Sequence, residues 1–147
     1  MNIQQIVYSS RPTPSLTLAD VDEIVASAQR FNEPRGITGR LLVVTDQSDN
    51  LLAFMQWIEG PLLPIQACLG RIVADTRHTT INVVRNQPAR ERSYPEWSMY
   101  REVIPVEQVE SALAAAGITG RIEEGEGVIV VEGEIVQSVS PEDVEGL

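Results

Sequence analysis

Apolar residues recur along the chain in two spacings, one typical of strands and one typical of amphipathic helices. The apolar run at 3–9 predicts a strand, and the prolines at 12 and 14 end it because proline cannot donate to a β-ladder. Thr17 and Asp20 then form a helix-capping pair. Four apolar residues follow on one helical face: Val21, Ile24, Val25 and Ala28. The pattern predicts a helix that ends before Pro34.

The middle of the chain repeats this alternation of strand and helix. Apolar runs at 37–45 and 51–59 flank a polar segment rich in turn formers, which predicts a hairpin. A second one-faced helix is predicted from Pro61 to Asp75, with apolar positions at Ile65, Cys68, Leu69, Ile72 and Val73. Two more strands are predicted at 79–84 and 97–103.

This order of elements is β-α-β-β-α-β with an extra strand, which is typical of an α+β, ferredoxin-like sandwich with both helices on one face of the sheet. The segment 105–116 predicts a third helix that could cover the other face. The Glu- and Gly-rich tail contains short β-like runs at 128–131 and 134–136, which form either a small hairpin or a partly ordered segment. We therefore predict a core domain at 1–104 and a C-terminal helix with a tail at 105–147.

Composition excludes several classes of function. The 147 residues suffice for one domain, and the net charge of −10 with no lysine argues against binding to nucleic acid. The lone Cys68 excludes an intramolecular disulfide and a multi-cysteine metal site, gives no support for a cysteine–flavin adduct, and favours a reducing compartment. No apolar run approaches the roughly 20 residues that a membrane span needs. We expect a soluble, cytoplasmic protein without membrane contact.

Three polar residues are candidates for chemistry. Tyr8 lies near the end of the first predicted strand, Asn32 follows the first helix, and Gln56 lies in the third strand. A phenol can donate an electron and a proton, and a carboxamide can both donate and accept hydrogen bonds, so Tyr8 and Gln56 could relay a proton. The alternative is that the tyrosine and the glutamine simply fill a sheet face and that the asparagine ends a helix.

The sequence around these residues resembles the BLUF family of blue-light sensors that use FAD. The matching segments are Ile6-Val7-Tyr8-Ser9-Ser10, Asn32-Glu33-Pro34-Arg35-Gly36-Ile37-Thr38-Gly39, Phe54-Met55-Gln56-Trp57-Ile58-Glu59-Gly60, Arg71-Ile72-Val73-Ala74-Asp75-Thr76-Arg77-His78 and Trp97-Ser98-Met99. The resemblance covers about the first hundred residues. It implies that Tyr8 and Gln56 contact the flavin and that Asn32 hydrogen-bonds its ring.

The resemblance implies further contacts to the cofactor. Arg71, Asp75 and His78 would reach the pyrimidine edge of the flavin or its phosphates, although an ordinary solvated helix end would explain them equally well. A flavin also needs an apolar slot, for which Ile24 and Ile72 on the two helices are candidate walls. No second histidine is present to join His78, so we predict no metal site.

The resemblance to the BLUF family implies that Trp97 and Met99 exchange places near Gln56 when the signalling state forms. On one strand the two side chains would share a face, because side chains alternate along a strand. Plain core packing is the alternative for Trp97. The exchange would give a physical route from the flavin to the protein surface.

The leading hypothesis is a photoreceptor without enzymatic activity that signals to a downstream protein partner and forms a homo-oligomer through an exposed strand edge or sheet face. The first alternative is a flavin-free interaction module on the same fold, which Ala28 and Phe31 favour because polar residues often stand there in the family. The second is a small phosphate-handling hydrolase, for which the chain offers no convincing pair of nucleophile and base.

Overall fold

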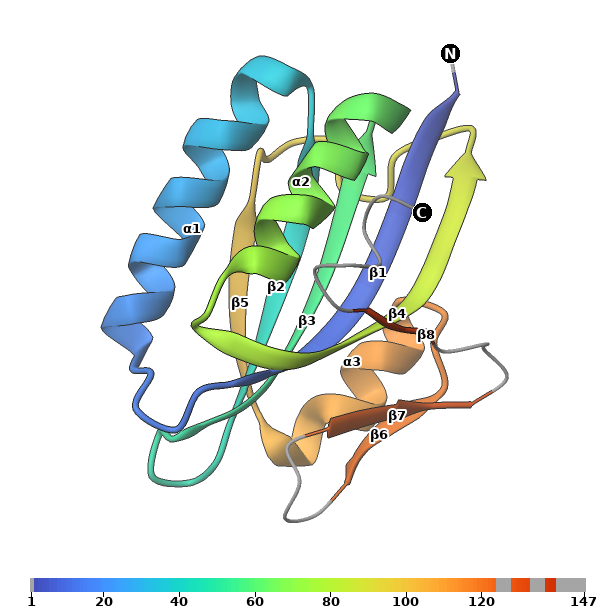
Figure 1. Cartoon of the computed structure of the whole chain (residues 1–147). Helices are drawn as coiled ribbons and strands as arrows, with labels where there is room; N and C mark the ends of the chain where they lie inside the picture. Colours follow the sequence, from blue (N-terminus) through green and yellow to red (C-terminus); the bar gives the residue numbers. More distant parts are fainter. Residues whose placement is uncertain (1, 124–127, 133–136, 140–147) are drawn as a thin grey trace.

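A mixed sheet with helices on both faces forms the body of the protein (Figure 1). The computed structural model describes residues 2–123, 128–132 and 137–139. Its elements are β1 (Ile3–Pro12), α1 (Leu18–Asn32), η1 (Glu33–Arg35), β2 (Thr38–Thr45), β3 (Leu51–Gly60), α2 (Leu62–Ala74), β4 (His78–Ala89), β5 (Tyr100–Pro105), η2 (Val106–Gln108), α3 (Val109–Ala115), β6 (Gly120–Glu123), β7 (Val128–Val131) and β8 (Gln137–Val139). The predicted α+β, ferredoxin-like class is confirmed.

The strand order of the main sheet is β5-β2-β3-β1-β4-β8, and β6 with β7 forms a separate two-stranded sheet. Within the main sheet, β2 and β5 are parallel and the other neighbours are antiparallel. β1 and β3 occupy the centre, and their register places Tyr8 directly opposite Gln56. Opposed residues of an antiparallel pair point to the same face, so the two side chains can meet.

Alternation along β3 divides the interior into two cores. Phe54 and Ile58 pack under α1 and α2, which lie side by side on one face of the sheet (Figure 1). Met55 and Trp57 point to the opposite face, where they pack with Leu113 of α3. We call these the helix-pair face and the far face. The segment predicted as a third helix therefore covers the face that α1 and α2 leave open.

The predicted strand at 97–103 is wrong at its start, because β5 begins at Tyr100. The preceding carbonyl groups accept hydrogen bonds from other parts of the fold: Ser98 O from the Asn32 side chain and Met99 O from the Gln29 side chain. The Trp97 carbonyl still accepts from the backbone N–H of Gly39 in β2, at 3.1 Å, but regular pairing with β2 begins only at Tyr100. Trp97 and Met99 consequently precede the strand, and strand alternation does not fix their relative directions.

The described part of the tail differs from the predicted hairpin. β7 pairs with the preceding strand β6, which brings Ile122 opposite Ile129 against the far-face core. The predicted partner at 134–136 lies outside the described residues. β8 adds to the outer edge of β4. The division of the chain at residue 104 stays a prediction.

Candidate functional site

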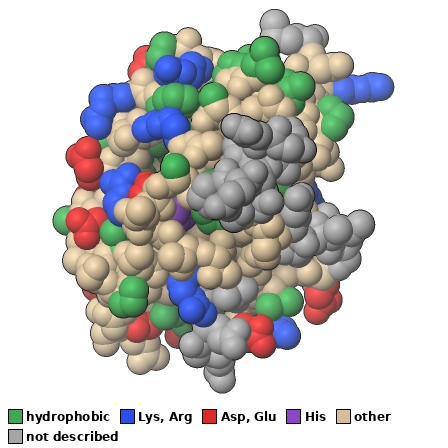
Figure 2. Space-filling model, viewed as in Figure 1, with side chains coloured by type: hydrophobic (Ala, Val, Ile, Leu, Met, Phe, Trp, Pro, Cys, Tyr) green, Lys and Arg blue, Asp and Glu red, His purple; other side chains and the backbone are tan. Residues whose placement is uncertain are grey.

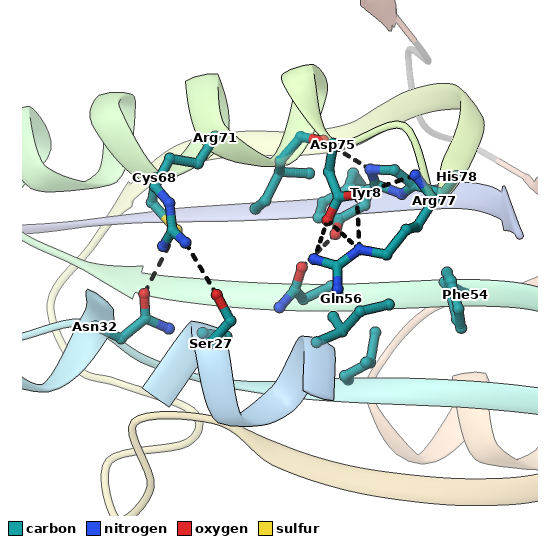
Figure 3. A pocket seen from close by; sticks show the side chains of 14 residues that line it. Tyr8, Ser27, Asn32, Phe54, Gln56, Cys68, Arg71, Asp75, Arg77 and His78 are labelled. Carbon is teal, nitrogen blue, oxygen red and sulfur yellow. Dashed lines mark hydrogen bonds and ion pairs between the residues drawn. The ribbon is translucent and has the colours of Figure 1, made fainter. Parts of the chain in front are cut away.

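A pocket opens between α1 and α2 above the centre of the sheet. Eight of the ten predicted site residues line it: Tyr8, Ile24, Asn32, Gln56, Arg71, Ile72, Asp75 and His78. Figure 3 shows several of these side chains converging from β1, β3 and the two helices. The empty volume is about 630 Å³, including space open to solvent.

Tyr8 and Gln56 line this pocket and form a buried chain of contacts with Met99, which does not line it. The Tyr8 hydroxyl donates to Gln56 Oε1, and Gln56 Nε2 donates to Met99 Sδ at 3.3 Å. Burial, followed by the nearby Cys68 and Asp75, raises the pKa of Tyr8 well above its usual value. The phenol therefore keeps its proton at neutral pH, and this proton lies on the hydrogen bond to Gln56.

Asn32 reaches the pocket because α1 ends at this residue. Its Nδ2 donates to Ser98 O at 2.8 Å, and its Oδ1 accepts from Cys68 Sγ at 3.6 Å. After the turn η1, Gly36 adopts a φ of 69°, which glycine permits without strain, and the chain enters β2. Burial raises the pKa of Cys68 to about 12, so the thiol stays protonated and is not a reactive thiolate.

Asp75 and Arg77 form an ion pair just beyond the end of α2. The Arg77 guanidinium donates to both carboxylate oxygens, with the closest contact at 2.7 Å, and the Arg77 backbone N–H donates at 3.0 Å. Partial burial works to raise the pKa of Asp75, but the hydrogen bonds and the charge of Arg77 outweigh it and lower this pKa. Asp75 is thus a carboxylate whose oxygens are already engaged within the protein.

His78 is held in one tautomer by two hydrogen bonds. Its Nε2 lies 2.7 Å from Ile72 O, which can only accept, so Nε2 carries the proton. Its Nδ1 lies 2.7 Å from Ser10 Oγ and accepts from that hydroxyl. Burial is the main cause that lowers the pKa of His78, so the ring is neutral at physiological pH. Figure 2 shows the histidine, in purple, at the bottom of a hollow with charged side chains on its rim.

The free energy of unfolding should fall as the pH drops below about 6.5, the pKa of an unfolded histidine, because the unfolded chain then binds a proton that folded His78 resists. Above this pH the neutral ring contributes its full stability. The loss is at most about 1.4 kcal/mol per pH unit. Urea unfolding at about pH 7.5 and 5.5 measures it. His78 is the single histidine, so His78→Gln should lose less than the wild type, and an equal loss would contradict this assignment.

Arg71 lies at the mouth of the pocket. Its guanidinium donates to Ser27 Oγ at 3.1 Å and lies 4.1 Å from the centre of the Phe31 ring. The Arg35 guanidinium also packs on this ring, at 3.8 Å. Phe31, a departure from the family pattern, thus contacts two arginines by cation–π interactions rather than filling the pocket.

The sequence predictions missed several lining residues: Ser27, Leu41, Phe54, Cys68 and Arg77. Two of them follow from spacing alone. Phe54 precedes Gln56 by two residues on β3, and Ser27 follows Ile24 by three on α1, so each shares the face of a predicted residue. Arg77 lies inside the segment that suggested Asp75 and His78, but only the folded chain shows its ion pair.

Trp97 lies outside the pocket, contrary to the prediction that it shares a face with Met99. The Trp97 side chain is 46% exposed and stacks on Tyr100, with ring centres 4.8 Å apart. Met99 is only 2% exposed and packs in the helix-pair core beside Gln56. The structure therefore has Met99 inward and Trp97 outward.

Metal and membrane signals are both lacking within the described residues. No group of three or more His, Cys, Asp or Glu side chains there could hold a metal ion. None of the described helices combines the length and the apolarity that crossing a membrane requires.

Comparison with known proteins decides the family. Residues 3–100 match BLUF, described as sensors of blue light using FAD. The chain belongs to the BLUF family. The photoactivated adenylate cyclase subunit beta of Euglena gracilis is 35% identical over 95 residues, which are 64% of this chain and 10% of that relative. The chain thus spans about a tenth of the length of the curated relatives it matches.

Solved BLUF structures share the fold. BlrB, a BLUF protein in its dark state, is 30% identical with a TM-score of 0.62, covering 78% of this chain and 80% of its own. The photo-activated state of BlsA is 28% identical with a TM-score of 0.63, covering 80% and 79%. Klebsiella pneumoniae BlrP1 with FMN and cyclic diGMP is 25% identical with a TM-score of 0.60, covering 78% and 29%.

FAD is the cofactor of the BLUF family, and the pocket of this chain fits a flavin. Ile24 and Ile72 supply apolar walls on opposite helices, while Asn32 and Gln56 supply carboxamides that can both donate and accept. Arg71 at the mouth supplies positive charge. Such a slot, apolar with a few polar groups, is what a ring with carbonyl groups and a phosphate-bearing tail requires.

Proposed function

We propose that this chain is a blue-light photoreceptor. In this proposal, Tyr8 and Gln56 transmit the light-induced change at the flavin to Met99. The buried chain of contacts from the Tyr8 hydroxyl through the Gln56 carboxamide to the Met99 thioether carries this proposal. Its three members lie on β1, β3 and the segment before β5. A rotation of the Gln56 side chain therefore alters contacts between separate parts of the fold.

In this proposal, each residue of the pocket contacts a different part of the flavin. Ile24 and Ile72 hold the ring from two sides, Asn32 hydrogen-bonds it, and Arg71 reaches the phosphates. Asp75 and His78 complete the polar end of the slot, with Asp75 acting together with Arg77 because the two form an ion pair at 2.7 Å. FAD held by these residues would supply the absorption of blue light and an acceptor for one electron and one proton.

Tyr8 would supply the electron, and its phenol proton would pass along the existing hydrogen bond to Gln56 Oε1 and from Gln56 to the flavin. The raised pKa keeps this proton on Tyr8 in the dark, so transfer waits until the electron has been withdrawn. When the electron and the proton have returned to Tyr8, Gln56 is again a neutral carboxamide, but it has turned and exchanged its donor and acceptor ends. Its oxygen now faces Met99 Sδ, which has no hydrogen to donate, so the contact with Met99 is lost.

Release of Met99 allows Trp97 to exchange places with it. Because Met99 is buried and Trp97 is exposed, the two arrangements differ at the surface beside β5. A partner that binds the two arrangements of Trp97 and Met99 with different affinity would respond to light. We propose that this partner is a protein, in view of the net charge of −10. The chain itself is a sensor and not an enzyme in this proposal, and the activities of its longer relatives are not assigned to it.

We propose self-association through the outer edge of β5, which ends the described sheet and is paired on one side by β2. We propose that the sensor core ends near residue 104. The lone, buried Cys68 supports a reducing, cytoplasmic location.

Absorption spectra test the proposed function. The purified chain is incubated with FAD, freed of excess cofactor, and measured in the dark, directly after blue light, and during recovery. We expect a flavin spectrum that shifts to the red and returns. Bound flavin without a shift would refute the relay through Tyr8 and Gln56, and a colourless protein would establish the flavin-free interaction module.

A further inference from the structure

A buried carboxylate on the far face of β3 ties down the segment that leads to Met99. Glu59 has no exposed surface and follows Gln56 by three residues, so the two side chains lie on opposite faces of the sheet. Glu59 Oε1 accepts from the Tyr94 N–H at 2.7 Å. Glu59 Oε2 accepts from the Ser93 N–H at 2.8 Å and from Gln5 Nε2 at 3.1 Å.

We call residues 92–99 the strap. Its first part is anchored on the far face, where Arg92 also donates to Gly36 O at 2.6 Å and to Glu59 O at 3.0 Å. Its last part reaches the helix-pair face, where Ser98 O and Met99 O accept from the side chains of α1 and Met99 Sδ accepts from Gln56. Both ends of the strap are therefore held by side chains of β3, namely Glu59 and Gln56.

A carboxylate is the group that this site requires. The three groups that face its oxygens are N–H donors, and the two bonds to strap backbone are as short as charge-assisted hydrogen bonds. A carboxamide at this position would turn one acceptor into a donor and set it against another donor. Burial of a carboxylate costs free energy unless such bonds are made, so the strap and Glu59 stabilise each other.

We propose that Glu59 is a positioning residue that latches the strap and thereby sets the rate at which the dark arrangement returns after light. This inference rests on the proposed function. Exchange of Met99 and Trp97 moves backbone that begins only a few residues beyond the latch at Ser93 and Tyr94. The latch favours the arrangement with Met99 inward, and its loss makes the light-adapted arrangement relatively more stable.

Glu59→Gln tests this role by the kinetics of recovery. Tyr8 and Gln56 are untouched, so the variant should still bind FAD and show the reversible red shift. Recovery in the dark should slow roughly tenfold, the factor expected when a buried, charge-assisted hydrogen bond is removed. Glu23→Gln is the control, because Glu23 is exposed on α1 and pairs with Arg30 rather than with the strap. Its recovery should stay within about twofold of the wild type.

Amide hydrogen exchange on the wild type gives a second readout that needs no variant to fold. Under continuous blue light the Ser93 and Tyr94 amides should exchange about tenfold faster than in the dark, because the strap leaves Glu59 more often. The Ile118 amide, which bonds Leu113 O near the same core, should not change. Unchanged exchange at Ser93 and Tyr94, or recovery of Glu59→Gln at the wild-type rate, would overturn the latch while leaving the photoreceptor intact. A wild type without any light-induced shift would refute the proposed function and the latch with it.

Discussion

Tyr8→Phe is expected to abolish the light-induced red shift while leaving flavin binding intact. Phenylalanine keeps the ring that packs in the helix-pair core but removes the hydroxyl that donates to Gln56 Oε1. Without this hydroxyl the variant has no phenol proton to transfer and no readily oxidised side chain in its place. The unpaired Gln56 oxygen should also lower the free energy of unfolding by about 1–3 kcal/mol. Difference spectra before and after blue light measure the first effect, and urea unfolding measures the second.

Tyr100→Phe is the control for this variant. It makes the same chemical change at a residue that is 40% exposed and whose ring can still stack on Trp97. This control should shift and recover like the wild type. A normal shift in Tyr8→Phe would mean that the electron and proton come from another group, and the proposed relay would be wrong.

Gln56→Leu is expected to remove the shift by a different route. Leucine fills nearly the same volume but can neither accept the Tyr8 proton nor donate to Met99 Sδ. Flavin should still bind, because Ile24, Ile72 and Arg71 are unchanged. The Tyr8 hydroxyl would become a buried donor without its partner, at a cost of about 1–3 kcal/mol.

The matched control is Gln87→Leu, the same substitution on an exposed part of β4. It should leave the amplitude and the recovery of the shift unchanged. If Gln56→Leu shifted normally, the carboxamide would not be the group that turns, and the contact between Gln56 and Met99 would have no role in signalling.

The sequence predicted most of the sheet and the floor of the pocket, because these depend on local patterns. The runs at 3–9 and 51–59 place Tyr8 and Gln56 beside apolar residues, and a ferredoxin-like order makes these strands adjacent. Helical spacing placed Ile24 and Ile72 on the inner faces of α1 and α2. Periodicity thus identifies the residues that point inward, and the topology brings them together.

The structure differs from the sequence predictions where side chains donate hydrogen bonds to backbone carbonyl groups. An apolar and aromatic run from Trp97 looks like a strand, yet Asn32 and Gln29 bind the carbonyl groups of Ser98 and Met99 and delay the start of β5. These partners lie more than sixty residues away, so no local pattern reveals them.

The hydrogen bonds of Glu59 to backbone N–H groups are a second kind of contact that the sequence does not predict. In the strand pattern a glutamate beside a turn reads as a solvated residue, but the strap folds over it and buries it completely. Its partners at Ser93 and Tyr94 are backbone groups, which carry no sequence signature. The pairing of β7 with β6 is similar, because either neighbouring run could have been its partner.

The methyl resonance of Met99, followed by NMR in the dark and under blue light, tests the central claim most directly. The chain has three methionines, so a methyl-labelled, FAD-loaded sample gives a simple spectrum. Met55 is fully buried on the far face and serves as the internal reference. We predict that the Met99 signal moves under light and returns with the flavin shift while Met55 stays in place. A Met99 signal that does not move while the flavin shifts would contradict the release of Met99 by Gln56.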